Sequence, residues 1–494
     1  MTQHALRLSQ LGLNAAGGAD PVLAGLAVDS RQVRPGYLFA ALPGTQAHGA
    51  GFVAAALDKG AVAILTDAEG AALAGPAMQG RGVAVVVAEN PRQTLAYAAA
   101  LWFGAQPKTM VAVTGTNGKT SVATFTRQIW MALGLEAVNL GTTGVEGAYA
   151  APLAHTTPEP ITLQRTLAAC AHAGITHAAM EASSHGLSQY RLDGVQLRAA
   201  GFTNFSQDHL DYHATFEAYF EAKAGLFTRV LPEDGCVVVN LDDPMGPRVA
   251  DIARARGQLV IGVGRQAGAD LQMQAQRFDS TGQHLRFAWH GEVHMARLNL
   301  IGGFQAENVL VAVGLAIASG SQPEAVFATL PQLDTVTGRM QLAATRSNGA
   351  AVFVDYAHTP DAVATALAAL RPHVMGRLVA VIGAGGDRDA GKRPLMGAAA
   401  AKAADLVFVT DDNPRSEDPA SIRAAVMQGC PAAQEVGDRA EAILRAVDAL
   451  GPGDALLICG KGHETGQTIA GTVYPFNDAE QASLAVAALD GRLA

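Results

Sequence analysis

The chain alternates short apolar runs with alanine-rich stretches, and this alternation constrains its fold more than any other feature. Each apolar run has the length of a buried strand, ends in Gly, Asp or Asn, and is followed by a segment of helical character. Such runs lie at 110–115, 176–181, 236–240, 351–356, 378–387, 406–413 and 455–462. The alternation predicts an α/β protein in which helices cover mostly parallel sheets.

Two interruptions of this alternation predict three domains. The segment FGAQPK at 103–108 separates a first α/β region from a new strand. The segment at 330–340, punctuated by Pro and Gly, precedes a fresh α/β series. A chain of 494 residues has room for this division. We predict domains over residues 1–104, 105–334 and 335–494.

The composition indicates a soluble globular protein. The chain is 49% hydrophobic and 16% charged, which supplies ample core. Its net charge of −9 argues against a general nucleic-acid surface, because such surfaces carry basic patches. The N-terminus lacks a signal-peptide pattern, no apolar run has the length of a membrane span, and the four cysteines form no CxxC pair. We therefore expect a cytoplasmic protein that binds neither nucleic acid nor membranes.

Polar residues gather where the predicted strands end. They fall at 114–120, 181–185, 355–358, 385–388, 411–415 and 460–464. In open α/β sheets, ligands bind outside the carboxyl ends of the strands. These segments are therefore the candidate functional sites.

The segment TGTNGKTS at 114–121 has the character of a phosphate-binding loop. It follows a predicted strand and opens a predicted helix, so its backbone N–H groups can cradle an anion. Lys119 can reach the outer phosphates of a nucleotide, and the Thr120 hydroxyl can bind Mg²⁺. The spacing differs from the common form, because the first glycine, Gly115, comes late.

With the motifs MEASSHGLSQYRL at 180–192, YFEAKAGLF at 219–227 and DYAHTPD at 355–361, this loop resembles the Mur ligases and their relative folylpolyglutamate synthase. The resemblance covers nearly the whole chain. These enzymes use ATP to join a carboxylate to an amine. The resemblance implies a UDP-sugar-binding N-terminal domain, a central P-loop-type ATPase domain with a mostly parallel sheet, and a C-terminal, Rossmann-like domain that binds an amino acid.

The resemblance also implies the nucleotide contacts, with ATP as co-substrate and Mg²⁺ as cofactor. The predicted ATP-binding residues are Gly115, Thr116, Asn117, Gly118, Lys119, Thr120, Ser121, Asn308, Arg339, Asp355 and His358. The family reads Gly-x-Phe-Asn-x-x-Asn at 302–308, and this chain has Gln305 in place of the first Asn.

Four residues are predicted to bind metal, and three are predicted to be catalytic. Glu181 ends a strand opposite the phosphate loop, and Mg²⁺ prefers one or two carboxylates plus phosphates and water. The resemblance adds Thr120, His209 and Lys223 to the metal site. It implies that Lys223 is carboxylated by CO₂, which converts its cation into an anion. Lys119, Lys223 and His209 are the expected catalytic residues.

The first two predicted domains carry residues that match the UDP-sugar-peptide contacts of the family members that add the third peptide residue. These are Val28, Ser30, Thr45, Gln46, Ala47, Thr156, Thr157, Ser183, Gln189 and Arg191. Hydroxyls together with an arginine suit a diphosphate and a peptide carboxylate.

The segment DNPR at 412–415 resembles that of the members that add meso-diaminopimelate, whereas lysine-adding members differ there. Diaminopimelate carries a second carboxylate and amine, which an arginine and an acid can bind. The predicted contacts are Arg388, Asp412, Asn413, Pro414, Arg415, Gly460 and Glu464.

The implied reaction is ATP-dependent addition of meso-2,6-diaminopimelate to UDP-N-acetylmuramoyl-L-alanyl-D-glutamate through an acyl phosphate, in peptidoglycan precursor synthesis. The partners are then small molecules only, and we expect a monomer. Two alternatives stay open. One is the same ligase chemistry with another acceptor, such as L-lysine or, on folate, glutamate. The other is an ATP-binding protein without ligase activity.

Overall fold

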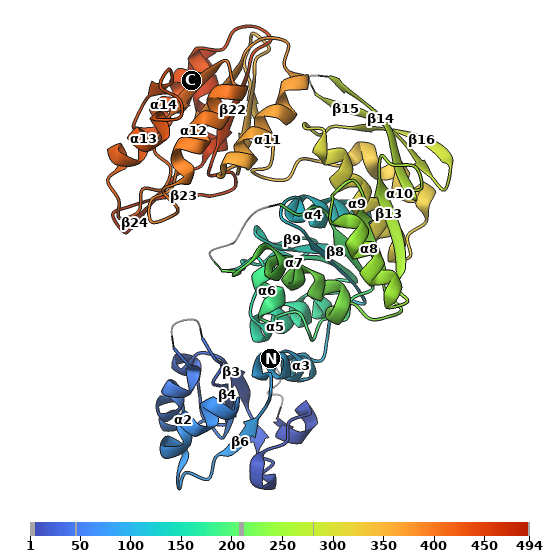
Figure 1. Ribbon diagram of the computed structural model, residues 1–494, viewed down its shortest axis with the longest axis vertical. Helices are drawn as coiled ribbons and strands as arrows, with labels where there is room; N and C mark the ends of the chain where they lie inside the picture. Colours follow the sequence, from blue (N-terminus) through green and yellow to red (C-terminus); the bar gives the residue numbers. More distant parts are fainter. Residues whose placement is uncertain (1–4, 45–46, 207–211, 280, 493–494) are drawn as a thin grey trace. The chain divides into compact units, whose positions relative to one another are not determined.

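The computed structural model describes residues 5–44, 47–206, 212–279 and 281–492 (Figure 1). The chain divides into two compact units, Met1–Leu271 with Leu310–Val326, and Gln272–Val309 with Phe327–Ala494. The division falls at the start of β14 (Leu271–Asp279), within α9 (Phe304–Ala318) and within α10 (Pro323–Thr329). The predicted domain boundaries at 104/105 and 334/335 stay predictions.

The first unit begins with a small parallel sheet in the order β3-β4-β5-β6. Side chains cap two of its helices: Asp67 accepts a bond from the Gly70 N–H at 2.7 Å, and Asn90 accepts one from the Gln93 N–H at 3.1 Å. The elements of this region are β1 (Leu6–Arg7), β2 (Val22–Leu23), β3 (Gly25–Ala27), β4 (Tyr37–Ala40), α1 (Val53–Asp58), β5 (Ala63–Thr66), α2 (Ala68–Met78), β6 (Ala84–Val87) and α3 (Pro91–Phe103).

The rest of the first unit is built on the strand order β13-β12-β11-β7-β10-β8-β9. All neighbours in this series are parallel except β8 and β9. The elements are β7 (Thr109–Thr114), α4 (Lys119–Ala132), β8 (Ala137–Gly141), β9 (Gly144–Gly147), α5 (Pro160–His172), β10 (His177–Glu181), α6 (Ser184–Ser188), β11 (Ala199–Phe202), α7 (Phe216–Gly225), β12 (Cys236–Asn240), α8 (Gly246–Ala255) and β13 (Leu259–Gly264).

The second unit contains antiparallel strands and a sheet in the order β17-β18-β22-β19-β20-β21, in which only β17 is antiparallel. Its further elements are β15 (Gly282–Trp289), β16 (Glu292–Leu298), β17 (Gln341–Thr345), β18 (Ala351–Asp355), α11 (Pro360–Leu370), β19 (Leu378–Ile382), α12 (Lys392–Ala403), β20 (Leu406–Val409), α13 (Pro419–Met427), β21 (Gln434–Glu435), α14 (Arg439–Asp448), β22 (Ala455–Cys459), β23 (Gly466–Ile469), β24 (Thr472–Pro475) and α15 (Asp478–Leu489).

Helices cover both faces of this second sheet. Along β19, Ala380 and Ile382 belong to the core that α11, α12 and α13 share, whereas Val379 and Val381 pack with α14 and α15. Alternate residues of a strand point to opposite faces, so a strand buried on both sides must be apolar throughout. This arrangement confirms the predicted α/β class, with mostly parallel sheets covered by helices.

The parallel register brings the polar strand ends together in each unit. In the first unit Glu181 pairs with Val113, and Phe202 pairs with Thr114, so the phosphate loop lies beside the ends of β10 and β11. In the second unit Asp355 pairs with Cys459, and β22 and β20 flank β19. The segments after these strands therefore share one sheet edge.

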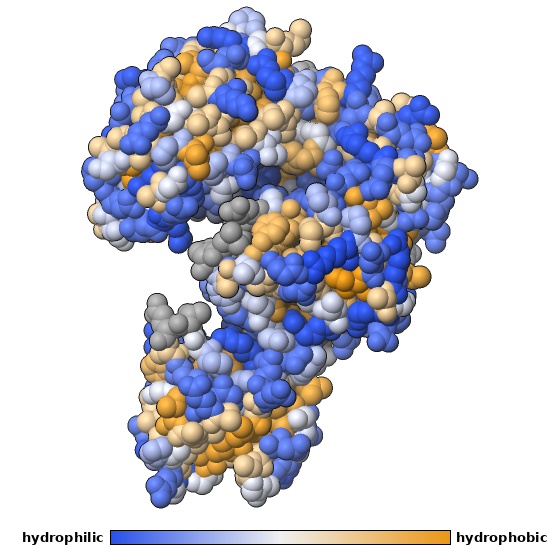
Figure 2. All heavy atoms as spheres, in the orientation of Figure 1, coloured by the Kyte–Doolittle hydropathy of each residue, from blue (hydrophilic) through white to orange (hydrophobic). Residues whose placement is uncertain are grey.

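In the space-filling view of Figure 2, hydrophilic residues and smaller apolar areas alternate over the visible face. Within the four described ranges, no helix combines the length and apolar character needed to cross a bilayer.

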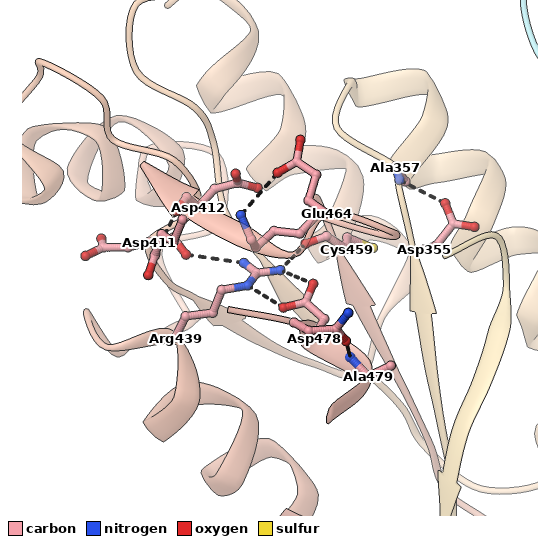
Figure 3. Close-up of polar contacts among 12 residues, drawn as sticks. Asp355, Ala357, Asp411, Asp412, Arg439, Cys459, Glu464, Asp478 and Ala479 are labelled. Carbon is pink, nitrogen blue, oxygen red and sulfur yellow. Dashed lines mark hydrogen bonds and ion pairs between the residues drawn. The ribbon is translucent and has the colours of Figure 1, made fainter. Parts of the chain in front are cut away.

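A buried ion pair ties the second unit together. The side chains of Arg439 and Asp478 are both 0% exposed. Arg439 Nε and Nη2 each donate to an Asp478 carboxylate oxygen at 2.7 Å, and Nη2 also donates to the Cys459 carbonyl at 2.9 Å (Figure 3). Burial alone opposes the charge on Arg439, but Asp478 outweighs this effect and raises the pKa of the guanidinium.

Replacing Asp478 with asparagine is expected to lower the free energy of unfolding by about 3–5 kcal/mol, because it leaves a buried guanidinium without its counter-charge. Urea denaturation measures this loss. The matched control is Arg445→Ala, which removes an exposed pair with Glu441 and is expected to cost less than about 1 kcal/mol. Equal losses in the two variants would contradict the account.

Candidate functional site

The segment after β7 forms a loop that presents its backbone at the N-terminus of α4. Gly118, with φ of 86°, immediately precedes the helix. The loop is braced from the segment after β11: the Thr116 N–H donates to the Asn204 carbonyl at 2.8 Å, and the Asn117 N–H donates to Asn204 Oδ1 at 2.9 Å. Lys119 Nζ folds back over the loop and donates to the carbonyls of Gly115 at 3.0 Å and Thr116 at 2.8 Å. This geometry suits a bound phosphate.

Gly115 has a φ of 150°, and a Cβ added there would lie 1.9 Å from Thr203 Oγ1. We expect Gly115→Ala to raise the KM for ATP about 10- to 100-fold. The backbone strain and the clash with Thr203 would move the loop and weaken the binding of ATP by about 1–3 kcal/mol. Steady-state kinetics with varied ATP measures the effect.

The control is Gly134→Ala, which also has a positive φ, of 79°, but meets no atom within 4 Å. It adds a methyl group at a positive φ without the clash. A similar rise in KM for ATP in both variants would overturn this explanation.

Glu181 lies where the sequence placed it, beside the phosphate loop. Its side chain is buried, and its Oε2 accepts a hydrogen bond from Thr120 Oγ1 at 3.0 Å. Its Oε1 accepts a bond from the Thr142 N–H at 2.8 Å. A carboxylate beside a hydroxyl at a phosphate loop fits Mg²⁺, which needs few protein ligands. No cluster of three or more His, Cys, Asp or Glu residues that could hold a metal occurs in the described parts of the chain.

Lys223 on α7 also reaches the phosphate loop. It is only 1% exposed, and its Nζ donates to the Gly115 carbonyl at 2.7 Å. The same Nζ lies 4.5 Å from the centre of the Tyr219 ring. Lys119 and Lys223 therefore donate to the same carbonyl oxygen. His209, the other predicted catalytic residue, lies outside the described residues.

The structure brings some of the predicted UDP-sugar-peptide residues together and leaves others apart. Arg191 Nη1 donates to the Thr157 carbonyl at 2.6 Å, and its Nη2 donates to Gln189 Oε1 at 2.7 Å. The Ser183 N–H donates to Thr157 Oγ1 at 3.1 Å, and the Thr156 hydroxyl lies 3.1 Å from the Thr142 hydroxyl. A pocket is lined by Val28, Leu42, Arg92, Glu159, Pro160, Gln189 and Arg191. Ser30 and Ala47 are described but do not line it, and Thr45 and Gln46 lie outside the described residues.

Sequence reasoning missed Arg92, which lines this pocket from the first turn of α3. Burial lowers the pKa of both Arg92 and Arg191, and Arg92 adds to the lowering at Arg191. Two neighbouring guanidinium groups suit an anionic ligand. The sequence did contain a signal for Arg92. Asn90-Pro91 marks the start of a helix, and the helix dipole disfavours a positive side chain in the first turn, so an arginine there suggests that it binds a ligand.

In the second unit, three predicted nucleotide residues gather around Tyr356. The Arg339 guanidinium lies 4.7 Å from the Tyr356 ring centre, and His358 Nδ1 lies 2.8 Å from the Tyr356 carbonyl. Asp355 accepts bonds from the Met340 and Ala357 N–H groups, both at 2.8 Å. Burial raises the pKa of Asp355 and lowers that of His358.

Asn308 lies elsewhere in this unit, on α9, where its Nδ2 donates to Gln305 Oε1 at 3.0 Å. The glutamine that departs from the family pattern thus orients the asparagine. The nucleotide roles of Asn308, Arg339, Asp355 and His358 stay predictions.

A second pocket is formed by the segments after β20 and β22 and by the β23–β24 hairpin. It is lined by Asn413, Arg415, His463, Glu464, Thr465, Gly466, Thr468 and Val473. Arg415 adopts a positive φ of 53° and is held by backbone bonds to Thr468 and Ala470. Its Nη1 donates to the Gly386 carbonyl at 2.7 Å.

The other residues predicted to bind diaminopimelate have different placements. Asp412 is buried beside the pocket, and Gly460 approaches it so closely that an added Cβ would lie 2.3 Å from Asp412 Oδ2. Pro414 packs its carbonyl against Gly386. Arg388 is exposed and does not line the pocket.

The chain is similar to known proteins over nearly its whole length. Residues 22–102 match the Mur ligase family catalytic domain, 113–316 the Mur ligase middle domain, and 338–462 the Mur ligase glutamate ligase domain. The UDP-N-acetylmuramoyl-L-alanyl-D-glutamate--2,6-diaminopimelate ligase of Caulobacter vibrioides is 49% identical, over 98% of this chain and 99% of that protein. The chain belongs to the Mur ligase family. The Bradyrhizobium diazoefficiens ligase of the same name is 50% identical over 94% of each chain.

Solved structures show the same fold. A UDP-N-acetylmuramoyl-L-alanyl-D-glutamate--2,6-diaminopimelate ligase matches with a TM-score of 0.72 and 33% identity, covering 98% of this chain and 99% of that one. The MurF ligase from Thermotoga maritima in complex with ADP matches with a TM-score of 0.62 and 18% identity, over 94% and 97% of the two chains. At that identity the second likeness concerns the fold alone. The family predicted from the sequence is confirmed.

Proposed function

We propose that this Mur ligase adds meso-2,6-diaminopimelate to UDP-N-acetylmuramoyl-L-alanyl-D-glutamate, with ATP as co-substrate, in peptidoglycan precursor synthesis. The observation that carries the proposal is the pocket in which Arg415 and Glu464 face one cavity, in a chain 49% identical to a ligase of that name. The substrates are small molecules, and the proposal keeps the cytoplasmic location and the monomeric state expected from the sequence.

The reaction has two steps. The D-Glu γ-carboxylate attacks the γ-phosphorus of ATP, which forms an acyl phosphate and releases ADP. The amine of diaminopimelate then attacks the acyl carbon, loses a proton, and expels inorganic phosphate as the amide forms. The protein accelerates both steps mainly by holding the reactants in place and offsetting their charge.

Lys119 supplies positive charge to the phosphates once it leaves the carbonyls of Gly115 and Thr116. Thr120 and Glu181 would hold Mg²⁺, which offsets phosphate charge when bound. His209 is proposed as a further metal ligand. Arg191, with Gln189, Thr156, Thr157 and Ser183, orients the UDP-linked peptide.

Carboxylation of Lys223 is part of the proposal. Its Nζ shares the Gly115 carbonyl with Lys119, and two ammonium groups on one oxygen repel each other. Reaction of the neutral amine with CO₂ forms an N–C bond, releases a proton and leaves a carbamate. The carbamate exchanges the repulsion for attraction to Lys119 and adds an anionic ligand for Mg²⁺.

The test is phosphate release from ATP in the presence of UDP-N-acetylmuramoyl-L-alanyl-D-glutamate, with either meso-diaminopimelate or L-lysine. We expect release with diaminopimelate and a tripeptide product by mass spectrometry. Equal release with L-lysine would keep the ligase and overturn the choice of acceptor. ATP binding without any amino-acid-dependent release would favour an ATP-binding protein that is not a ligase.

A further inference from the structure

The turn after β22 buries a lysine that sequence reasoning passed over. Lys461 lies between Gly460 and Gly462, yet its side chain is 0% exposed. A fully buried ammonium is stable only when its charge is matched and its N–H groups are bonded. The residues that accept the hydrogen bonds of Lys461 and balance its charge therefore indicate its role.

Both hydrogen-bond acceptors of Lys461 are predicted ligand contacts. Its Nζ donates to Asn413 Oδ1 at 3.2 Å and to Glu464 Oε2 at 3.1 Å. Asn413 and Glu464 both line the pocket of the second unit, whereas Lys461 does not. Lys461 thus lies behind the pocket and contacts its wall.

These contacts fix the orientation of the Asn413 amide. Oδ1 faces two donors, Lys461 Nζ and the Thr468 N–H, the latter at 2.9 Å. Nδ2 faces two carboxylates and donates to Asp412 Oδ1 at 3.0 Å and to Glu464 Oε2 at 2.9 Å. An amide oxygen only accepts hydrogen bonds and an amide nitrogen only donates them. If the amide were reversed, its nitrogen would point at two other donors and its oxygen at two carboxylates.

Charge gives Lys461 a second effect. Asp412 and Glu464 bond to the same Asn413 nitrogen, so their carboxylates are close neighbours and repel each other. Asp412 also feels the charge of Arg439, but the bonds of Arg439 go to Asp478 and to backbone carbonyls (Figure 3). Lys461 is the cation that bonds directly to Glu464. Glu464 lines the pocket and its side chain is 33% exposed, so its carboxylate can also accept a hydrogen bond from an ammonium group of the ligand.

We propose that Lys461 is a positioning residue that holds Asn413 and Glu464 in the arrangement that recognises the distal amino-acid end of the acceptor. The inference rests on the proposed function, because it takes diaminopimelate to bind in this pocket. Without Lys461, the Asn413 oxygen keeps only the Thr468 N–H as a donor, and Glu464, which has lost its cation, moves away from Asp412. The acceptor then binds weakly, while ATP and the UDP-linked peptide bind as before.

The test compares the full-length wild-type protein with Lys461→Met, which removes the charge and keeps a similar chain length. The matched control is Lys402→Met, the same change at an exposed lysine near the end of α12. We expect Lys461→Met to raise the KM for meso-diaminopimelate about 30-fold, as for loss of one partner of a buried charge pair. The KM values for ATP and the UDP-linked peptide should change less than about twofold, as should all three in the control.

A double-mutant cycle with Glu464→Gln separates positioning from general damage. If Lys461 acts through Glu464, the effect of Lys461→Met on the KM for diaminopimelate should shrink at least about fivefold in the Glu464→Gln background. Independent effects would instead multiply, and this result would overturn the proposal. Equal changes in the three KM values, or unfolding of both Lys461→Met and Lys461→Gln, would assign the lysine to stability alone and also overturn it. A wild-type protein without diaminopimelate-dependent phosphate release would instead refute the proposed function.

Discussion

Replacing Lys119 with methionine is expected to lower kcat by about 10³-fold. The phosphoryl group carries its charge on oxygens that need a cation, and Lys119 is the cation attached to the loop itself. The expected change is in kcat rather than in the KM for ATP, because charge builds up on the bridging oxygen as the bond to the γ-phosphate breaks. Phosphate release at saturating substrates measures it.

The control for this experiment is Lys108→Met, which removes an exposed lysine just before β7 and is expected to leave kcat unchanged within about twofold. Lys119→Arg should not restore activity, since a planar guanidinium does not fit where a compact ammonium donates to the carbonyls of Gly115 and Thr116. A loss of less than about tenfold in Lys119→Met would mean that other groups neutralise the phosphates.

The fold was predictable because its signals are local. The apolar run at 236–240 coincides with β12, and the run at 110–115 differs from β7 by one residue at each end. A strand buried on both faces has to be apolar along its length, so the sequence records its limits. The carboxyl-end rule then placed Glu181 beside Thr120 without knowledge of the fold in three dimensions.

The parts of the site that escaped prediction depend on distant partners. Lys461 is buried by contacts with Asn413, which is 48 residues away, and nothing in Gly-Lys-Gly distinguishes it from an exposed turn. Arg92, in the first turn of α3, and Arg191, in the turn after α6, line one pocket although they are far apart in the sequence. The roles given to Thr45, Gln46 and His209 stay predictions from family resemblance.

Replacing Arg415 with methionine is expected to raise the KM for meso-diaminopimelate about 100-fold, which corresponds to about 3 kcal/mol. The pocket is built to hold this arginine in place. Its backbone is locked at a positive φ of 53° between Thr468 and Ala470, and one N–H group is committed to the Gly386 carbonyl. The remaining N–H groups can bind the distal carboxylate of the acceptor in a bidentate manner. Arg445→Met, at an exposed site on α14, is the control and should leave this KM unchanged.

A comparison with L-lysine, an acceptor that lacks that carboxylate, tests the role of Arg415. L-lysine has a distal amine but no distal carboxylate, so it leaves the guanidinium of the wild-type protein without a partner, and such a mismatch can discriminate by about 10⁴-fold. In Arg415→Met no guanidinium is left unpaired when L-lysine binds, and diaminopimelate loses the contact between its distal carboxylate and the guanidinium. The ratio of kcat/KM for the two amino acids should therefore fall by more than the rise in KM for diaminopimelate alone. If Arg415→Met impaired both acceptors equally, the arginine would shape the pocket without reading the carboxylate, and selectivity would have to come from Asp412, Asn413 and Glu464.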